Sequence, residues 1–359
     1  MKAYSLPSII AFILLAVFAV TVLATHAWDP MAFVLDRPED VPADQTWAIG
    51  YDGQQAHAIA IDPFGAADEL DRPAYRYQRI LYPMLSRLLA LGISDLIPWS
   101  MLLINLIAAS ATVYFLSGLL ADRGANPWWS LVPLLSFNYL IGVRMDLNEP
   151  LAYALALGGL WAFDRRHTAW AATLFALAGL TREVALVFPI ALAAWLLLSR
   201  RWGDALIIAA ASLVPFVSWA VVVRLFLGAS PFATPLARPL LIPFAGMTYL
   251  EGIEGRVMVG LWAVVPAGLA AIAAVAVILR RKGNMQSPDA LLVLANSAVI
   301  AVLPVPTWVD PLAVLRLGTG LILALLLWLA RIRPAWLLFT AGLWIPSLLL
   351  AFMIPGFLL

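Results

Sequence analysis

Long apolar runs separated by short polar breaks cover most of this chain, beginning at Leu6 and continuing to the C-terminus. Many of these runs approach the roughly 17 to 25 residues that cross a bilayer as a helix. Because the bilayer core offers no water to unpaired backbone groups, such runs are expected to be helical. The pattern predicts an all-α integral membrane protein that forms a single membrane domain over residues 1–359.

One long polar segment, residues 26–78, interrupts the apolar pattern and carries ten acidic residues and three arginines. A segment of this composition belongs in water. The next apolar run, Ile80 to Leu91, is short and places Arg87 on the polar side of a helical spacing, which is typical of a helix lying on the membrane. We therefore predict a large first outer loop over residues 26–95 that contains an interfacial helix over residues 80–91.

Clusters of basic residues predict the topology. Arg165-Arg166, Arg200-Arg201, Arg280-Arg281-Lys282 and Arg331/Arg333 are each separated by room for two crossings, the positive-inside pattern. Total Lys plus Arg is equal on the two sides, so the orientation depends on this clustering. An odd number of crossings must separate the outer loop from the inner Arg165-Arg166, yet four apolar runs lie between them, so one of the four does not cross. We assign this to the run over 80–91, and the remaining crossings place the C-terminus outside. Eleven crossings are expected, at about residues 6–24, 97–120, 128–143, 151–163, 168–180, 184–198, 204–227, 257–279, 289–303, 311–330 and 335–354.

The first apolar run, Leu6 to Leu23, follows a single Lys2. Its length exceeds the roughly 7 to 15 apolar residues of a signal-peptide core, so we interpret it as a retained anchor. The alternative is a cleaved signal, for which Thr25-His26-Ala27 is the one arguable cleavage site.

Composition supports the membrane assignment and excludes several classes of function. Hydrophobic residues make up 63% of the chain and charged residues 12%, against about 25% charged in soluble domains. A net charge of +1 gives no basic field for nucleic acid. The absence of cysteine excludes disulfides and thiol chemistry. P-loop, dinucleotide-binding, serine-elbow and zinc-protease motifs are also missing from the sequence.

Two of the expected hairpins are unusually short and have charged breaks. One covers residues 128–163 and breaks at 144–150, and the other covers 168–198 and breaks at Thr181-Arg182-Glu183. Helices shorter than about 17 residues do not span a bilayer unaided, so we expect a water-filled recess on the outer side. Its floor is expected to carry Asp146, Glu149, Arg182 and Glu183.

Asp52 and three arginines are the main chemical candidates. Asp52 in Tyr51-Asp52-Gly53-Gln54 is either part of a simple turn or a general base facing the recess. Arg76 and Arg79, beside Tyr77, either snorkel in an aromatic belt with Tyr75 and Tyr82 or grip a phosphate. Arg316, one turn after Asp310-Pro311, needs an anionic partner, which is a phosphate or Asp310.

The two hairpin breaks resemble helix starts. Asn148-Glu149-Pro150 and Thr181-Arg182-Glu183 each place a capping residue before an acid in the first helical turn. One hypothesis gives them only this capping role, with Arg144 and Arg182 neutralising the acids. The other is that Glu149 and Glu183 orient a polar substrate or hold a divalent metal. His57 either assists at this site or is an ordinary surface residue.

Taken together, these motifs resemble the GT-C class of membrane glycosyltransferases, especially bacterial relatives of the PIG-V type of mannosyltransferase. Tyr51-Asp52-Gly53-Gln54 is similar to the aromatic-Asp-Gly motif of their first outer loop, and Tyr77 to Pro83 to the segment that follows it. The two helix starts are similar to that family's Glu-containing and Thr-Arg-containing starts. The likeness covers roughly residues 1–200. One departure is that Gln54 to His57 follow Asp-Gly, where the family often has an aromatic residue.

The resemblance implies transfer of a sugar from a polyprenyl-phosphate donor to a cell-surface glycan or lipid acceptor. The active site would face the outside of a bacterial inner membrane. Asp52 would be the catalytic carboxylate, Arg76, Arg79 or Arg316 would hold the donor phosphate, and Glu149 and Glu183 would shape the sugar or metal pocket. The competing hypotheses are a transporter or flippase of a lipid-linked or small polar substrate, and an accessory subunit without chemistry.

Overall fold

The computed structural model describes residues 4–34, 51–232, 238–280, 287–354 and 357, and within these ranges all regular structure is helical. The all-α prediction is confirmed for this part of the chain. The α-helices are α1 (Ser5–Thr25), α2 (Met31–Val34), α3 (Asp52–Ile61), α4 (Pro73–Tyr77), α5 (Leu81–Leu89), α6 (Ile97–Asp122), α7 (Leu131–Leu134), α8 (Phe137–Arg144), α9 (Glu149–Asp164), α10 (Thr168–Thr181), α11 (Val187–Leu198), α12 (Trp202–Leu227), α13 (Ile253–Val259), α14 (Val265–Arg280), α15 (Asp289–Ala301), α16 (Val305–Val309), α17 (Pro311–Leu317), α18 (Thr319–Ile332), α19 (Trp336–Trp344) and α20 (Leu350–Met353). Short 3-10 helices cover Ala66–Glu69, Ser94–Leu96, Pro127–Ser130, Glu183–Leu186, Ala245–Tyr249 and Ile345–Leu349, and a π-helix covers Gly260–Val264.

The described residues contain six helical stretches that are long and apolar enough to cross a membrane, as expected for a multi-pass membrane protein. They are Ser5–Thr25, Ser94–Asp122, Trp202–Leu227, Ile253–Arg280, Pro311–Ile332 and Trp336–Met353. Other expected crossings correspond to shorter apolar helices, among them Thr168–Thr181, Glu183–Leu198 and Asp289–Ala301. The total of eleven crossings therefore stays a prediction.

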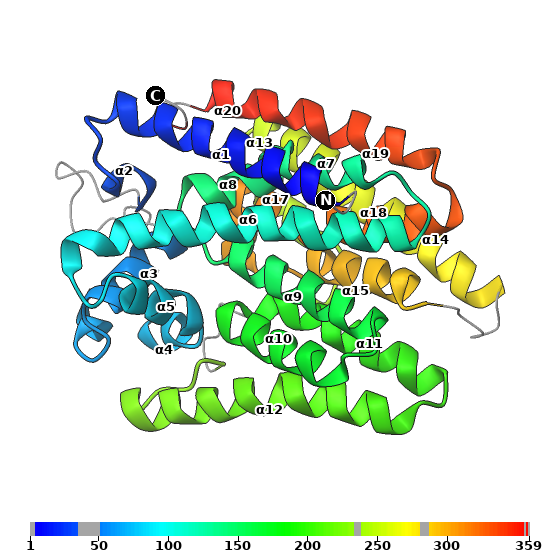
Figure 1. Cartoon of the computed structure of the whole chain (residues 1–359), viewed down its shortest axis with the longest axis horizontal. Helices are drawn as coiled ribbons and strands as arrows, with labels where there is room; N and C mark the ends of the chain where they lie inside the picture. Colours follow the sequence, from blue (N-terminus) through cyan, green and yellow to red (C-terminus); the bar gives the residue numbers. More distant parts are fainter. Residues whose placement is uncertain (1–3, 35–50, 233–237, 281–286, 355–356, 358–359) are drawn as a thin grey trace.

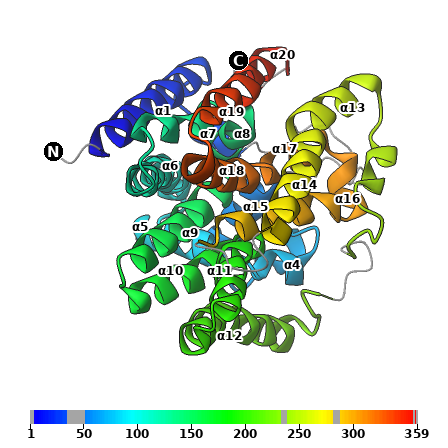
Figure 2. The same cartoon turned by 90° about the vertical axis from the view of Figure 1, so that its right-hand side faces the viewer.

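The helices differ sharply in how much of their apolar surface is covered by protein. In Pro311–Ile332, 89% of the most apolar window is buried, compared with 28% in α12 and 33% in α1. Figure 2 shows α18 inside the bundle, with α1 and α12 on its outer sides. Because lipid tails are as apolar as a protein core, we assign the uncovered faces of α1 and α12 to contact with lipid.

The part of the first loop that the structure describes forms short helices at one end of the bundle. Figure 1 shows α3, α4 and α5 together beside the first turns of α6. Residues 35–50 of the predicted loop lie outside the described residues. A helix forms where the interfacial helix was expected: α5 buries Tyr82 and Ser86 and exposes Leu88 and Leu89. Its position at the membrane surface stays a prediction.

Both short hairpins break where the sequence predicted, but their caps differ from the expected ones. Glu149 begins α9, with Pro150 in its first turn. The Asn148 side chain does not cap that helix; its amide donates instead to the carbonyl oxygen of Thr181, at 3.2 Å. Thr181 ends α10 and does not cap the following 3-10 helix. The last carbonyl groups of a helix have no partner within that helix, and here the Asn148 amide of the first break supplies one for Thr181 at the second break. This hydrogen bond connects the two hairpins.

Arg144 interacts by charge with Asp146, as the neutralising hypothesis expected, and also makes hydrogen bonds elsewhere in the fold. Its Nη1 donates to the carbonyl oxygen of Ala32 at 2.6 Å, and its Nε donates to the carbonyl oxygen of Phe357. The guanidinium lies over the rings of Phe33 and Phe357. Arg144 therefore joins the first loop to the C-terminal segment.

A charged cluster around Asp289 joins three helices at the C-terminal end of α6. The carboxylate of Asp289, at the start of α15, is fully buried. It accepts from Arg123 at 2.9 Å, just after α6, and from Arg331 at 3.0 Å, near the end of α18. This cluster fixes the bundle at the end away from α5.

Candidate functional site

The site is built around Asp52, the first residue of α3. Gly53 explains how this helix comes so close to the first hairpin break. A Cβ on Gly53 would lie 2.1 Å from the carbonyl oxygen of Met145 and 3.0 Å from that of Asp146. Only glycine permits this approach. The Asp52-Gly53 pair is therefore the first turn of a buried helix, and the simple-turn interpretation is wrong.

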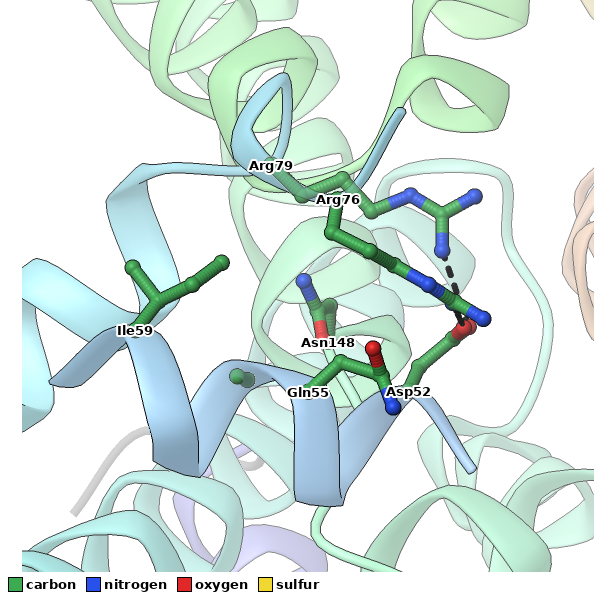
Figure 3. Close-up of a pocket in the computed structure, with 7 residues that line it drawn as sticks. Asp52, Gln55, Ile59, Arg76, Arg79 and Asn148 are labelled. Atoms are coloured by element: carbon green, nitrogen blue, oxygen red, sulfur yellow. Dashed lines mark hydrogen bonds and ion pairs between the residues drawn. The ribbon is translucent and has the colours of Figure 1, made fainter. Parts of the chain in front are cut away.

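Four arginines surround the Asp52 carboxylate, which is 6% exposed. Arg76 Nη1 contacts Oδ1. Oδ2 lies 2.9 Å from Arg79 Nη1, 2.8 Å from Arg182 Nη1 and 3.0 Å from Arg316 Nη1. Figure 3 shows Arg76 and Arg79 reaching toward Asp52 from the same stretch of chain. We call these four guanidinium groups the arginine cage.

Three further carboxylates hold the cage from outside. Glu183 accepts two bonds from Arg79, at 2.9 Å from Nε and 2.5 Å from Nη2. Glu149 lies 3.0 Å from Arg182 and 3.5 Å from Arg316. Asp71 accepts two bonds from Arg76, at 2.6 and 2.7 Å. With Asp52 included, four carboxylates balance the four arginines of the cage.

This arrangement strongly favours the ionised form of Asp52. Burial by itself would raise the pKa of the carboxyl, but Arg316, Arg79, Arg76 and Arg182 together hold it well below its ordinary value of 3.8. Burial also tends to lower the pKa of Arg79, and Glu183, Tyr75 and Asp52 more than compensate, so that its pKa lies above the ordinary range. The site is consequently a fully charged cluster removed from water.

The cage has buried donors to spare. Among the described residues, Arg79 Nη1, Arg182 Nε and both Nε and Nη1 of Arg316 are buried without a hydrogen-bond partner of good geometry. Two of these atoms, Arg79 Nη1 and Arg316 Nη1, lie at the ion-pair distances from Asp52 given above, so their attraction to the carboxylate is one of charge. Buried guanidinium groups with unused donors suit a phosphate, which offers several acceptor oxygens in fork-like geometry.

At Asp52 the described residues enclose only a small cavity, and the predicted water-filled recess stays a prediction. The cavity that touches Asp52 has a volume of about 10 Å³, roughly the size of one water, and is lined by Gln55, Asn148 and neighbouring residues. Of the charges expected on the floor of the recess, Glu149, Arg182 and Glu183 pack in the arginine cluster, whereas Asp146 pairs with Asn105. Each cage arginine has a carboxylate within contact distance.

A larger apolar groove of about 640 Å³ lies on the other side of α4. It is lined mainly by apolar side chains, with Asp62 and Arg87 as its charged lining residues; the apolar groove comprises Asp62, Pro63, Phe64, Tyr77, Ile80, Met84, Arg87, Trp219, Val222, Val223 and Phe226. The indole N–H of Trp219 donates to the carbonyl oxygen of Tyr77 at 2.7 Å, which attaches α12 to α4. Since Arg76 and Tyr77 are adjacent in the chain, α4 forms a wall between the cage and the groove.

Two predicted site residues lie outside the cage. Tyr77 lines the apolar groove and packs its ring edge against Phe226, with centroids 6.1 Å apart. Asp146 is fully buried beneath Gly53, and its Oδ1 accepts from Asn105 Nδ2 at 3.1 Å. The Tyr77 hydroxyl and Asp146 Oδ2 are both buried without a hydrogen-bond partner, and neither side chain joins the arginines.

The structure also adds residues that sequence reasoning missed. Asp71 was one of many loop acids, and no local signal distinguishes it. Its backbone N–H donates to Gln55 Oε1 at 3.2 Å, which connects it to α3. The aromatic-belt alternative does not fit Tyr75 and Tyr82, because Tyr82 is fully buried and the Tyr75 ring lies under the Arg79 guanidinium at 4.5 Å.

Other expectations for the site have mixed outcomes. Arg316 pairs with Asp52 and Glu149 and also interacts by charge with Asp310, as one alternative expected. The Asp310 carboxylate in addition accepts from the backbone N–H of Leu312 and caps α17. Among the residues that the structure describes, no group of three His, Asp or Glu side chains is arranged to hold a metal. The use of Glu149 and Glu183 as metal ligands stays a prediction.

Comparison with known proteins does not assign a family. No protein-family model matches the chain, and neither a curated protein nor a solved structure matches it significantly. The function is therefore argued from the chemistry of the site.

Proposed function

We propose that this protein is a membrane glycosyltransferase that moves a sugar from a polyprenyl-phosphate donor to a glycan or lipid acceptor. The observation that carries the proposal is a buried carboxylate, Asp52, at the centre of four arginines and next to an apolar groove. One wall, α4, borders both. This arrangement matches a ligand with a charged head, a reactive sugar and a long apolar chain.

The arginine cage supplies what a phosphate leaving group requires. When the bond between the sugar C1 and the phosphate oxygen breaks, negative charge builds up on that phosphate. Preorganised cations in a site removed from water stabilise such charge more strongly than water does. Arg79, Arg182 and Arg316 are each at least nine-tenths buried and keep donors unused, so they fit this role.

The apolar groove supplies a place for the chain of the lipid. Its volume of about 640 Å³ accommodates several isoprene units, and its lining of Phe, Trp, Val, Ile and Met side chains makes contacts without polar demands. Because α12 forms one side and has an uncovered apolar face, the rest of the chain can continue into lipid. A polyprenyl phosphate thus meets suitable chemistry at both ends.

Asp52 is the proposed general base. It would take the proton of the acceptor hydroxyl while the hydroxyl oxygen forms a bond to the sugar C1 and the C1–O bond to the phosphate breaks. The polyprenyl phosphate leaves with the electron pair of that bond, and the proton stays on the carboxyl. Glu149 and Glu183 hold the arginines in place and have oxygens that can bond sugar hydroxyls. We place this site on the outer side of a bacterial inner membrane.

The test is complementation of a deletion strain. Wild-type protein, Asp52→Asn and a control, Asp95→Asn, are expressed at matched membrane levels, and surface glycopolymer is analysed by gel and glycan composition. Asp95 is an exposed acid at the same end of the bundle. We expect product with wild type and Asp95→Asn and a loss of at least about a hundredfold with Asp52→Asn, the lower range for removal of a general base.

Product restored equally by Asp52→Asn would remove this carboxylate from catalysis. The transporter or flippase alternative is distinguished by a second assay with reconstituted vesicles and a polyprenyl-phosphate sugar. Transfer of labelled sugar to an acceptor supports the enzyme. Movement of the intact lipid across the bilayer without transfer supports transport.

A further inference from the structure

We infer that the arginine cage is an anion site that Asp52 and a phosphate group occupy in turn, so that the arriving phosphate releases the Asp52 carboxylate. The carrier of that phosphate, a polyprenyl lipid, rests on the proposed function. The exchange itself rests on the geometry of the cage. A single oxygen, Oδ2 of Asp52, lies within 3.0 Å of guanidinium nitrogens from three arginines, Arg79, Arg182 and Arg316.

The charge balance of the cluster favours exchange over simple addition. With Asp52 inside, the four arginines are matched by Asp52, Asp71, Glu149 and Glu183. A phosphate added to this neutral cluster would lie next to the carboxylates. Two negative charges at such a short distance repel each other strongly. If Asp52 leaves, four arginines face three carboxylates, and an entering phosphate restores the balance.

The unused donors point the same way. A carboxylate has two oxygens, whereas each of the four guanidinium groups offers five N–H donors. In the described residues Arg79 Nη1 and Arg316 Nη1 lie within 3.0 Å of Asp52 without good hydrogen-bond geometry. Asp52 is therefore an incomplete ligand for this cage. A phosphate arranges its oxygens tetrahedrally, so it can reach donors that the planar carboxylate leaves unused.

Release gives Asp52 the property that the proposed reaction needs. Inside the cage its pKa is held far below the ordinary value by the four arginines, and such a carboxylate is a poor proton acceptor. Outside the cage, with the arginines turned to the phosphate, its pKa moves back toward the usual range. The base is thus activated only when the donor phosphate is in place.

The fold provides a short path for this movement. Asp52 is the first residue of α3, so its side chain can turn about Cα–Cβ while Gly53 keeps the helix against the break at Met145. The cavity of about 10 Å³ lies beside it and is lined by the amide side chains of Gln55 and Asn148 as well as by Arg76 and Arg79 of the cage. Figure 3 shows these two amides to the left of the Asp52 carboxylate, with the Arg79 guanidinium above it.

The experiment measures binding of farnesyl phosphate and of inorganic phosphate to the purified full-length chain by calorimetry. The inference makes an unusual prediction: Asp52→Asn, which removes a proposed catalytic residue, binds phosphate about tenfold or more tightly than wild type because the competitor is gone. Asp52→Glu keeps the competing charge and binds like wild type. Arg316→Gln binds at least about tenfold more weakly, and Asp95→Asn is unchanged.

Unchanged or weaker binding by Asp52→Asn overturns the exchange, whatever the enzyme does. Tighter binding by Asp52→Asn, in a protein whose wild type transfers no sugar, supports the exchange and rejects the proposed function instead. A preference for farnesyl phosphate assigns a lipid-linked phosphate to the cage. Equal affinity for the two ligands supports the exchange with free phosphate as the ligand.

Wild-type protein provides a second measurement if Asp52→Asn does not fold. Infrared difference spectra are recorded while farnesyl phosphate is added, with aspartate labelled by carbon-13. A shift of a labelled carboxylate band at the stoichiometry of binding supports release of Asp52. Bound phosphate with no change in the labelled bands overturns it.

Discussion

The carboxylate of Asp52 and the guanidinium of Arg182, 130 positions apart in the chain, form a 2.8 Å hydrogen bond inside the protein. Asp52 begins a helix of the first loop, whereas Arg182 lies in the break of the second short hairpin. This pair therefore attaches the loop to the membrane bundle. It also places the proposed base and a proposed phosphate ligand in direct contact, which makes their relationship open to experiment.

Replacing Gly53 should disturb the site without changing any charge. In Gly53→Ala the new Cβ would lie 2.1 Å from a backbone oxygen, so α3 must move away from the hairpin break. We expect a loss of about 1 to 3 kcal/mol in stability, measured by thermal unfolding in detergent. Gly203→Ala is the control, because a Cβ there meets no atom within 4 Å, and it should be neutral or slightly stabilising. Equal behaviour of the two variants would contradict the close approach of α3.

Removing the charge of Asp289, in the cluster at the C-terminal end of α6, should lower stability and leave phosphate binding intact. Asp289→Asn leaves Arg123 and Arg331 without their shared, fully buried carboxylate. Breaking a buried ion pair by removing one partner typically costs about 3 to 5 kcal/mol. The partly exposed surface pair of Arg201 and Asp204 is the control, and Asp204→Asn should cost less than about 1 kcal/mol. Unfolding midpoints of both variants, with farnesyl phosphate affinity as the second readout, check this prediction.

The contribution of Asp52 to stability should persist to low pH. Its pKa in the folded protein is depressed below 3.8, so the stabilisation is complete above that ordinary value and is lost only as the pH falls through the folded-state pKa. The difference in melting temperature between wild type and Asp52→Asn should accordingly stay constant from about pH 8 to about pH 5 and shrink only in stronger acid. A difference that disappears already near neutral pH would show that the arginines do not hold the carboxylate as described.

The apolar groove predicts a dependence on chain length. Val222 lines the groove, while its neighbour Val221 does not belong to the lining, and both are about half exposed. Val222→Trp should weaken binding of undecaprenyl phosphate by about three- to tenfold through overpacking, with little effect on a short-chain phosphate. Val221→Trp should bind both ligands like wild type. The prediction fails if Val222→Trp leaves the preference for long chains unchanged in competition binding.

Much of the architecture could be predicted from the order of apolar and polar residues. Runs long enough to span a membrane must be helical, because unpaired backbone groups are too costly in lipid, and six such stretches are present in the described residues. The positions of the two hairpin breaks were predicted in the same way, since Glu149 begins α9 and Thr181 ends α10. The all-α class and the charged breaks are thus local properties of the chain.

Contacts between distant residues were decided only by the tertiary structure. The motifs and the charges near apolar runs indicate that Asp52, Arg79, Arg182 and Arg316 are functional. They do not indicate that the three arginines contact one oxygen of Asp52. Asp71, indistinguishable from other loop acids, joined the cluster through Arg76. Tyr77, one residue away from Arg76, turned to the groove. Such pairings depend on how helices far apart in sequence pack, which no local pattern of residues specifies.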